Sequence, residues 1–237
     1  MNNHENPEIS VVIPVYNDKK SLEKAIPESI SALEKITSSF ELIIAEDNSN
    51  DKSKEFVENY EKTDSRVKLL HSDERQGRGK ALNNAFSEAK GDIVCYYDVD
   101  LATDLDHLKE LIDSIRNGAD IATGSRLMKN SDIVRTTDRE IASRGYNLLV
   151  RLILKSRLCD HQCGFKAFNK KQLLKLLPFV YSLHWFWDTE VLVRGQRAGY
   201  KIKEFPVRWR TGTGTTVKFN DIFSMGTDIL KLWWQLR

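Results

Sequence analysis

The chain has 237 residues, of which 41% are hydrophobic and 30% are charged, a composition typical of a folded globular protein and not of a disordered one. This length accommodates one substantial core and leaves little room for two independent domains. No apolar run approaches the roughly 20 residues that span a bilayer, and the polar segment 1–7 does not resemble a secretory leader, so the expected compartment is the cytoplasm.

The net charge of +2 hides an uneven distribution along the chain. Residues 1–120 contain 15 Lys and Arg against 25 Asp and Glu, whereas residues 121–237 contain 21 against 9. One interpretation is ordinary surface variation. The other is that an acidic half holds a metal ion while a basic half faces phosphates or an anionic membrane. We expect no nucleic-acid partner, because the aromatic residues do not alternate with the basic ones as a base-stacking platform requires.

Short apolar runs alternate with helical patterns through the first half of the chain. The β-branched run at residues 9–15 predicts a strand that is buried on both faces, and the apolar spacing of residues 19–36 predicts a helix. The same alternation predicts further strands at residues 41–45, 67–70, 92–97 and 119–123, and helices at residues 51–61, 80–89 and 105–116. It indicates an α/β fold with a mostly parallel sheet and helices on both faces. The carboxyl ends of the strands then share one edge, where ligands bind in such sheets.

The pattern is less regular in the second half. Apolar positions at helical spacing predict helices at residues 138–157 and 185–198, and residues 201–210 are expected to form a strand. Basic residues are interspersed along the first of these helices.

The last segment is amphipathic. We expect one α/β domain over residues 1–218, followed by an amphipathic helix over residues 219–237. That helix either packs against the domain or lies at a membrane interface, for which the indole rings of Trp233 and Trp234 are suited.

The three cysteines, Cys95, Cys159 and Cys163, are expected to be free thiols. Cys159 and Cys163 enclose His161, which makes a zinc site conceivable. A structural zinc ion requires four ligands, however, and no second Cys/His pair lies nearby in the sequence. Small buried thiols are the preferred interpretation.

Two carboxylates, Asp98 and Asp100, follow the apolar segment 93–97. Alternate residues of an extended chain point the same way, so both side chains can face one ion. Paired hard oxygen ligands beside a diphosphate suit Mg²⁺ or Mn²⁺, which neutralises the charge that grows on a leaving nucleotide. A D-x-D sequence is frequent by chance, and its position at an expected strand end favours the functional interpretation.

A polar cluster at residues 46–49 stands at another expected strand end. Its residue types cap helices, and Asp47 can serve as a cap and still accept a hydrogen bond from a base or a ribose. Residues 77–80, Gly-Arg-Gly-Lys, lack the spacing of a P-loop. We interpret them as a tight turn that opens a helix close to the nucleotide.

Several short segments together resemble glycosyltransferase family 2. They are residues 11–17 (VVIPVYN), 46–49 (EDNS), 91–92 (GD), 98–100 (DVD) and 124–126 (GSR). Residues 162–168 (QCGFKAF), 187–190 (WDTE) and 199–200 (GY) make the chain similar to dolichyl-phosphate β-glucosyltransferases and to the related mannose synthases. The resemblance extends from residue 8 to residue 218 and implies a GT-A, Rossmann-like fold.

The resemblance also implies roles for individual residues. The metal ligands would be Asp98 and Asp100, and the nucleotide-sugar contacts would be Pro14, Tyr16, Asn17, Asp47, Lys80 and Asp98. The pattern that binds the lipid phosphate matches Arg126, Arg139, Ser143, Arg210 and Lys218. The catalytic set would be Asp100, Arg126, Asp188 and Glu190, with the last two at the sugar end of the cleft.

The implied activity is inverting transfer of a sugar from a nucleotide diphosphate to dolichyl or another polyprenyl phosphate. UDP-glucose or UDP-N-acetylglucosamine is the favoured donor, and the product would supply protein glycosylation from the cytoplasmic face of a membrane. Mannose synthases commonly carry Gln two residues after the second Asp, where this chain has Ala102, which weakens a GDP-mannose assignment. The phosphate acceptor is already anionic at neutral pH, so the site needs cations more than a general base.

Two alternatives remain open. A family-2 enzyme acting on a sugar hydroxyl would need Asp188 or Glu190 as a general base. A non-catalytic nucleotide-sugar binding protein is disfavoured by the acidic triplet and the arginines. The sequence leaves the oligomeric state open.

Overall fold

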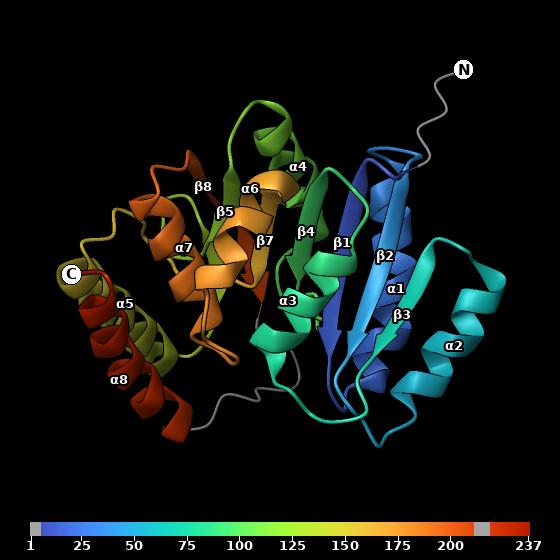
Figure 1. Ribbon diagram of the computed structural model, residues 1–237, viewed down its shortest axis with the longest axis horizontal. Coiled ribbons are helices and arrows are strands. Elements are labelled where there is room, and N and C mark those ends of the chain that lie inside the picture. The colour runs from blue at the N-terminus through green and yellow to red at the C-terminus, as the bar shows by residue number, and fades with distance from the viewer. Residues whose placement is uncertain (1–5, 211–218) are drawn as a thin grey trace.

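A seven-stranded sheet organises the computed structural model, which describes residues 6–210 and 219–237 without the side chains of residues 219–224 (Figure 1). The strand order is β3-β2-β1-β4-β7-β5-β8, and β7 runs antiparallel to both of its neighbours while the other pairs are parallel. The strands are β1 (Ile9–Val15), β2 (Phe40–Glu46), β3 (Val67–His71), β4 (Ile93–Tyr97), β5 (Ile121–Ser125), β7 (Phe165–Asn169) and β8 (Ile202–Pro206).

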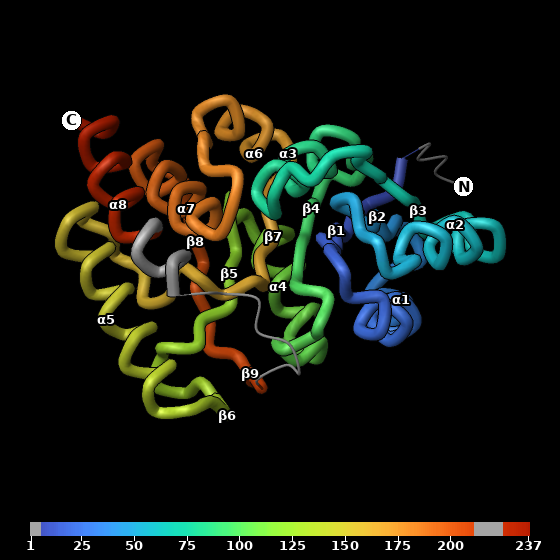
Figure 2. Tube along the Cα trace, turned by 90° about the horizontal axis from the view of Figure 1, so that it is seen from below, coloured from blue at the N-terminus to red at the C-terminus, as the bar shows by residue number. Residues whose placement is uncertain are grey.

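Helices cover both faces of the sheet, as the alternating pattern predicts. In β1, Val11 and Ile13 pack into one core while Val12 packs into the other, so the continuous β-branched run is buried on both sides. The first core contains α1 (Lys19–Glu34), α2 (Ser53–Thr63) and α4 (Leu108–Arg116), and the second contains α3 (Arg78–Glu88), α6 (Lys170–Leu176) and α7 (Trp187–Arg197). Figure 2 shows α1 and α4 on one side of the row of strands and α3 and α6 on the other.

The second half of the chain contains elements that the sequence did not predict, among them α6 and β7, and one expected strand is divided. Strand β7 was not expected, because Lys166 interrupts an apolar segment that is otherwise short. In the structure Lys166 is fully buried and contacts an acidic partner. Residues 201–210 form two strands, since β9 (Arg208–Arg210) leaves the main sheet and pairs with β6 (Asp132–Val134). Short 3₁₀ helices occur at Leu105–His107 and Leu177–Phe179.

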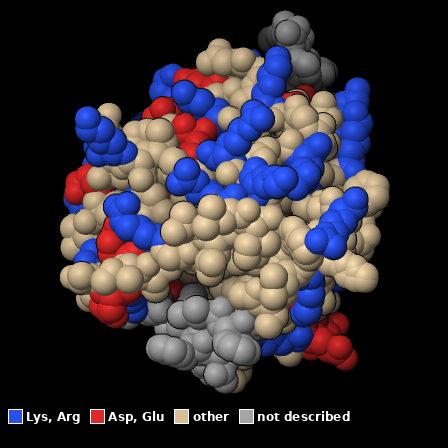
Figure 3. All heavy atoms as spheres, turned by 90° about the vertical axis from the view of Figure 1, so that its left-hand side faces the viewer, with Lys and Arg blue, Asp and Glu red and all other residues tan. Residues whose placement is uncertain are grey.

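A third core lies at one end of the sheet, between α5 (Thr137–Leu154), α7 and α8 (Phe219–Gln235). Met225, Ile229 and Leu232 of α8 are buried there with residues of α5 and α7. The two helices lie side by side at the left of Figure 1, and Figure 3 looks onto that end of the molecule. No helix within the described residues is both long enough and apolar enough to cross a membrane.

The candidate site lies at the point where the strand order reverses. The chain passes from β1 to β2 and β3 on one side and then returns to place β4 on the other side of β1. Loops that leave the carboxyl ends of β1 and β4 therefore diverge and leave a crevice between them, which is where ligands bind in open α/β sheets. Asp98 and Asp100 follow β4 directly at this point.

Gly91 lies where two segments of the chain approach each other closely, so a substitution there tests this packing. A Cβ atom at Gly91 would lie 2.5 Å from the backbone nitrogen of Ser10, whereas a Cβ at Gly145, inside α5, would meet nothing within 4 Å. We expect Gly91→Ala to lower the free energy of unfolding by roughly 1–3 kcal/mol through overpacking. Gly145→Ala should raise it by up to about 1 kcal/mol, because alanine favours the helix. Chemical denaturation measures both, and equal effects would contradict the packing described.

Candidate active site

The acidic loop after β4 lies against the start of β7. Because β7 is antiparallel, its first residues stand at the same edge of the sheet as the carboxyl ends of β1 and β4, and the Asp98 N–H donates to the Gly164 carbonyl at 3.3 Å. A Cβ at Gly164 would overlap the Asp98 carboxylate, so this position tolerates no side chain without displacing Asp98. The QCGF segment of the sequence thus supports the acidic triplet directly.

Asp98 and Asp100 form a pair whose charges repel each other. Burial and the neighbouring Asp98 raise the pKa of Asp100 to about 6, and Asp18 adds to the effect. A divalent cation would relieve this repulsion, and the donors are hard carboxylate oxygens, so the residues fit Mg²⁺ or Mn²⁺. Within the described part of the chain, no group of three or more Asp, Glu, His or Cys is positioned to hold a metal. An ion here would therefore take its remaining ligands from substrate phosphates and water, as Mg²⁺ commonly does.

Arg78 connects this pair to the second acidic position. Its guanidinium donates to Asp98 Oδ1 at 2.7 Å and to Asp188 Oδ2 at 2.6 Å, and its side chain is 12% exposed. Burial lowers the pKa of Arg78, but Asp98 and Asp188 outweigh it and hold the group above its usual value. No role is expected for Arg78 from the sequence alone. The available clue was a charged residue between two glycines at a predicted helix start.

Asp188 is enclosed by donors. It accepts hydrogen bonds from Arg78, from Lys166 Nζ at 2.8 Å and from the Tyr96 hydroxyl, and it is 2% exposed. Burial raises the pKa of Asp188 to about 6, with Arg78 opposing the shift, and burial lowers the pKa of Lys166 to about 7. Both shifts arise because water is excluded, so each charge depends on its partners. Sequence reasoning missed Lys166, which reads as an ordinary exposed lysine.

Two further acids hold loops in place around Arg78. Asp47 accepts hydrogen bonds from two backbone N–H groups. Its Oδ1 accepts from Gln76 at 2.7 Å and its Oδ2 accepts from Gly77 at 2.9 Å. Glu190 accepts the N–H groups of Tyr181 and Ser182 at 3.0 and 2.8 Å. That second loop packs directly on the first, because the Gly79 N–H donates to the Leu183 carbonyl. Asp47 and Glu190 thus orient the turn from which Arg78 projects.

The loop after β1 lines the other side of the crevice. Pro14 lies in β1, and Tyr16 follows it with its ring 3.8 Å from the Arg75 guanidinium carbon. Asn17 adopts a left-handed backbone and ties this loop to the next one, since its N–H donates to Ser49 and its side chain accepts from Asn50. These contacts bring the predicted nucleotide residues of β1 and β2 together at one edge.

A pocket of about 410 Å³ opens beside Asp47, with His71, Ser72 and Asn84 in its lining. A wider pocket of about 820 Å³ lies near Gly118 and Lys201, which precede β5 and β8 and stand at the opposite edge of the sheet. Lys80 is exposed on the first turn of α3. Only the smaller pocket adjoins the predicted nucleotide residues.

Arg126 is held by a buried partner that the sequence did not reveal. Its guanidinium donates to both oxygens of Asp160, at 2.7 and 2.9 Å, and its backbone N–H donates to the same carboxylate. Burial lowers the pKa of Arg126, but Asp160 and, more weakly, Cys163 and Asp98 outweigh it.

The remaining predicted basic residues are more dispersed. Arg210 is exposed and pairs with Asp132, while its backbone N–H donates to the Ala102 carbonyl and so lies beside the acidic loop. Arg139 is exposed on the first turns of α5. Among the described residues, no contact joins Arg139 to Arg126 or to Asp98. Lys218 lies outside the described residues.

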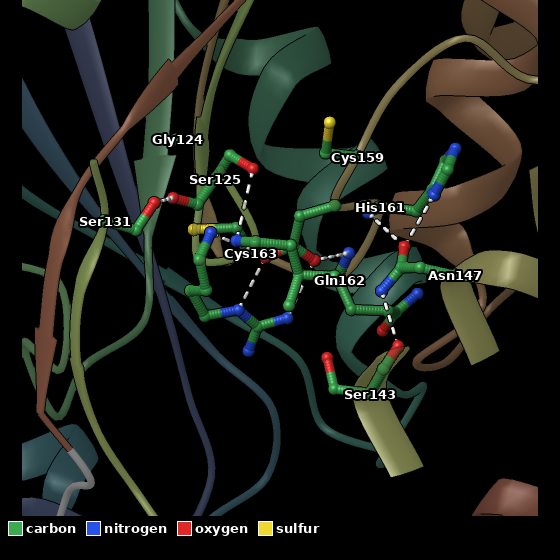
Figure 4. Close-up of polar contacts among 12 residues, drawn as sticks. Gly124, Ser125, Ser131, Ser143, Asn147, Cys159, His161, Gln162 and Cys163 are labelled. Carbon is green, nitrogen blue, oxygen red and sulfur yellow. Dashed lines mark hydrogen bonds and ion pairs between the residues drawn. The ribbon is translucent and has the colours of Figure 1, made fainter. Parts of the chain in front are cut away.

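A buried polar network attaches α5 to the loop that carries Asp160. Asn147 accepts hydrogen bonds from the backbone and ring of His161, and its amide donates to the Ser143 carbonyl; the other His161 nitrogen contacts Ser156. Figure 4 shows Asn147 between His161 and Ser143. The Ser143 hydroxyl oxygen is buried and has no hydrogen-bond partner among the described residues. Cys95, Cys159 and Cys163 are free thiols; Cys95 and Cys163 are buried as expected, whereas Cys159 is half-buried.

The comparisons with known proteins agree with this geometry. A family model described as glycosyl transferase family 2 matches residues 10–177. Glycosyltransferase AglD of Haloferax volcanii is 47% identical over 233 residues, and a dolichyl-phosphate beta-glucosyltransferase of Trichomonas vaginalis is 33% identical over 234 residues. The alignments cover 97% and 94% of this chain, but the chain spans only 37% of the first relative's length and 72% of the second's.

Solved structures share the fold. Glucosyl-3-phosphoglycerate synthase from Mycobacterium tuberculosis, in complex with Mn²⁺, UDP and glucosyl-3-phosphoglycerate, matches with a TM-score of 0.68 at 17% identity, over 98% of this chain and 80% of that one. The same enzyme with Mn²⁺, UDP and phosphoglyceric acid matches with a TM-score of 0.70. At this identity the likeness concerns the fold alone.

The buried His161 gives a prediction for stability against pH. Burial lowers its pKa from 6.5 to about 4, so the folded chain binds the proton less readily than the unfolded chain. The contribution of His161 to the free energy of unfolding is therefore fully present above pH 6.5. It falls by about 1.4 kcal/mol per pH unit as the pH drops toward 4. His161→Gln should lack this component. Denaturation of both proteins at several pH values measures the difference, and identical slopes would mean that His161 protonates freely in the fold.

Proposed function

Because the chain belongs to glycosyl transferase family 2, we propose that this glycosyltransferase moves a sugar from a nucleotide diphosphate to dolichyl or another polyprenyl phosphate, with inversion. The observation that carries the proposal is the carboxylate pair Asp98 and Asp100 at the reversal of strand order, in a chain similar over nearly its whole length to a dolichyl-phosphate beta-glucosyltransferase. That similarity favours a glucose-type donor, UDP-glucose or UDP-N-acetylglucosamine, over GDP-mannose. Ala102, where mannose synthases commonly carry Gln, supports the same preference.

On the donor side, Asp98 and Asp100 would hold Mg²⁺ or Mn²⁺. When bound, the ion neutralises the charge that develops on the departing nucleotide diphosphate. Tyr16 and Asn17 would border the nucleotide, and the pocket beside Asp47 is open next to them. Arg78 adds a positive charge at the same place and is held there by the turn that Asp47 fixes.

On the acceptor side, the hydrogen bonds that Asp188 accepts favour a phosphate acceptor over a sugar hydroxyl. A sugar hydroxyl must lose its proton to a general base, and Asp188 is occupied by three donors instead. Glu190 is likewise engaged by two backbone N–H groups and by Arg194. A polyprenyl phosphate is already ionised and needs cations to bring it to the donor. Arg126, Arg139 and Arg210 are proposed for this role, with Ser143 as a hydrogen-bonding group.

We also propose that the enzyme works at the cytoplasmic face of a membrane, associated peripherally, and supplies lipid-linked sugar for protein glycosylation. The three free thiols suit a reducing compartment. The division into a transferase domain over residues 1–218 and a helix over residues 219–237 remains part of this proposal.

Metal dependence tests the donor side. We expect Asp100→Ala to reduce transfer on the order of a thousandfold, because the ion contributes several kcal/mol to the transition state. Asp106→Ala removes an exposed acid that pairs with Arg208 and should leave the rate nearly unchanged. Initial rates with and without excess chelator measure both effects. Full turnover in chelator would refute the metal role.

The acceptor side is tested by Arg139→Ala. A charge-assisted hydrogen bond to phosphate contributes roughly 1.5–3 kcal/mol, so the KM for polyprenyl phosphate should rise on the order of 10- to 100-fold. The KM for the nucleotide-sugar should stay nearly constant, and Arg139→Lys should recover only part of the loss. Arg197→Ala, an exposed arginine at the end of α7, is the matched control. An equal rise in both KM values would contradict the separate roles of the two halves.

A further inference from the structure

Helix α5 carries apolar side chains on two opposite sides. On one side Val150 and Leu154 are buried, together with the polar Asn147. On the other side four large residues remain exposed: Ile141 (67%), Leu148 (52%), Leu149 (48%) and Leu152 (67%). Ile141, Leu148 and Leu152 are separated by seven and four positions, and Leu149 comes three positions before Leu152. Residues at these spacings form one stripe along a helix. A helix face in contact with water is ordinarily polar. An exposed apolar stripe of this length is typical of a surface that binds another protein or a membrane.

Helix α8 continues this apolar surface. It packs beside α5 through Met225, Ile229 and Leu232, while Leu230 and Trp234 are 57% and 63% exposed. Trp233 is also partly exposed, with the Arg237 guanidinium carbon 3.5 Å from its ring centre. We call the exposed residues of the two helices the α5–α8 face. It is the end of the molecule that Figure 3 presents, where Lys and Arg side chains border a broad uncharged area.

The charges around the α5–α8 face are mostly positive. Arg144, Arg151 and Lys155 are exposed along one edge of the α5 stripe, at positions that alternate with its leucines. Two acids of these helices are already neutralised, because Glu140 is held by Arg135 and Arg144 and Asp228 by Lys231. Long basic side chains around an apolar strip with indole rings are the pattern of interfacial helices.

We propose that the α5–α8 face docks on an anionic lipid bilayer. The apolar stripe would enter the headgroup region, the basic edge would contact lipid phosphates, and the indole rings would lie at the interface. A second copy of the chain is a poorer occupant, because its own face presents the same cations, Arg151 and Lys155 among them. The inference rests on the proposed function, since Arg139 and Ser143 lie at the start of α5 and docking would bring them to the surface where the acceptor phosphate lies.

Co-sedimentation with vesicles tests the docking. The probes are vesicles of phosphatidylcholine alone and vesicles of equal parts phosphatidylcholine and phosphatidylglycerol. Wild type should bind the anionic vesicles and bind neutral ones more weakly. Replacing both Leu149 and Leu152 by Ser, or both Arg151 and Lys155 by Gln, should weaken partitioning on the order of tenfold or more. Leu174→Ser, at an exposed leucine of α6, and the pair Lys24→Gln with Lys109→Gln are matched controls and should bind as wild type does.

The outcomes separate docking from the chemistry. All variants should keep the wild-type thermal unfolding profile, because every substituted side chain is exposed. The α5 variants should keep transfer to a short-chain polyprenyl phosphate in detergent and lose it with vesicle-embedded acceptor. Equal binding of wild type and α5 variants overturns the docking, as does a wild-type dimer that the leucine variant abolishes in sedimentation velocity. Vesicle binding without transfer to any polyprenyl phosphate supports docking and rejects the proposed function instead.

Discussion

The need to pair charges that are buried away from water governs the centre of this molecule. Arg78, Lys166 and Asp188 come from α3, β7 and α7; Lys166 and Asp188 are buried, and the Arg78 side chain is only 12% exposed. An unpaired charge in such a place costs several kcal/mol. The three elements are therefore held in one arrangement, because any displacement would leave a buried charge without its partner. Asp98 is joined to this cluster through Arg78 and so takes its position from the same constraint.

This arrangement separates acids that hold the structure from acids that remain for a ligand. Asp47 and Glu190 use their oxygens on backbone N–H groups, and Asp188 uses its oxygens on three side chains. Asp98 and Asp100 are different, because their mutual repulsion is only partly relieved by Arg78. Pre-formed repulsion of this kind is what a bound divalent cation compensates. Among the described residues, Asp98 and Asp100 are therefore the pair proposed to hold the metal ion.

The fold places the acidic and the basic half of the chain in different parts of the molecule. Most of the acidic half forms β1 to β4 and their helices, whereas the basic half forms the end of the sheet that carries α5 and α8. Arg126, which follows β5 and is bound to Asp160, stands where the two parts meet. A donor held on one side and an anionic acceptor on the other would meet there. The resemblance to glycosyltransferase family 2 that the sequence motifs indicate is confirmed by the family match.

The sequence by itself determined the alternating α/β architecture, the family and the position of Asp98 and Asp100 at a strand end. These follow from local periodicity and from short motifs, which depend on neighbouring residues. Only the tertiary structure decided the antiparallel direction of β7, the division of residues 201–210 into two strands, and the partners of Arg78, Arg126 and Lys166. Arg78 and Asp188 are 110 positions apart, and no pattern along the chain links them. Burial of a lysine is favourable only when a distant carboxylate lies beside it, so such a residue resembles a surface residue until the chain has folded.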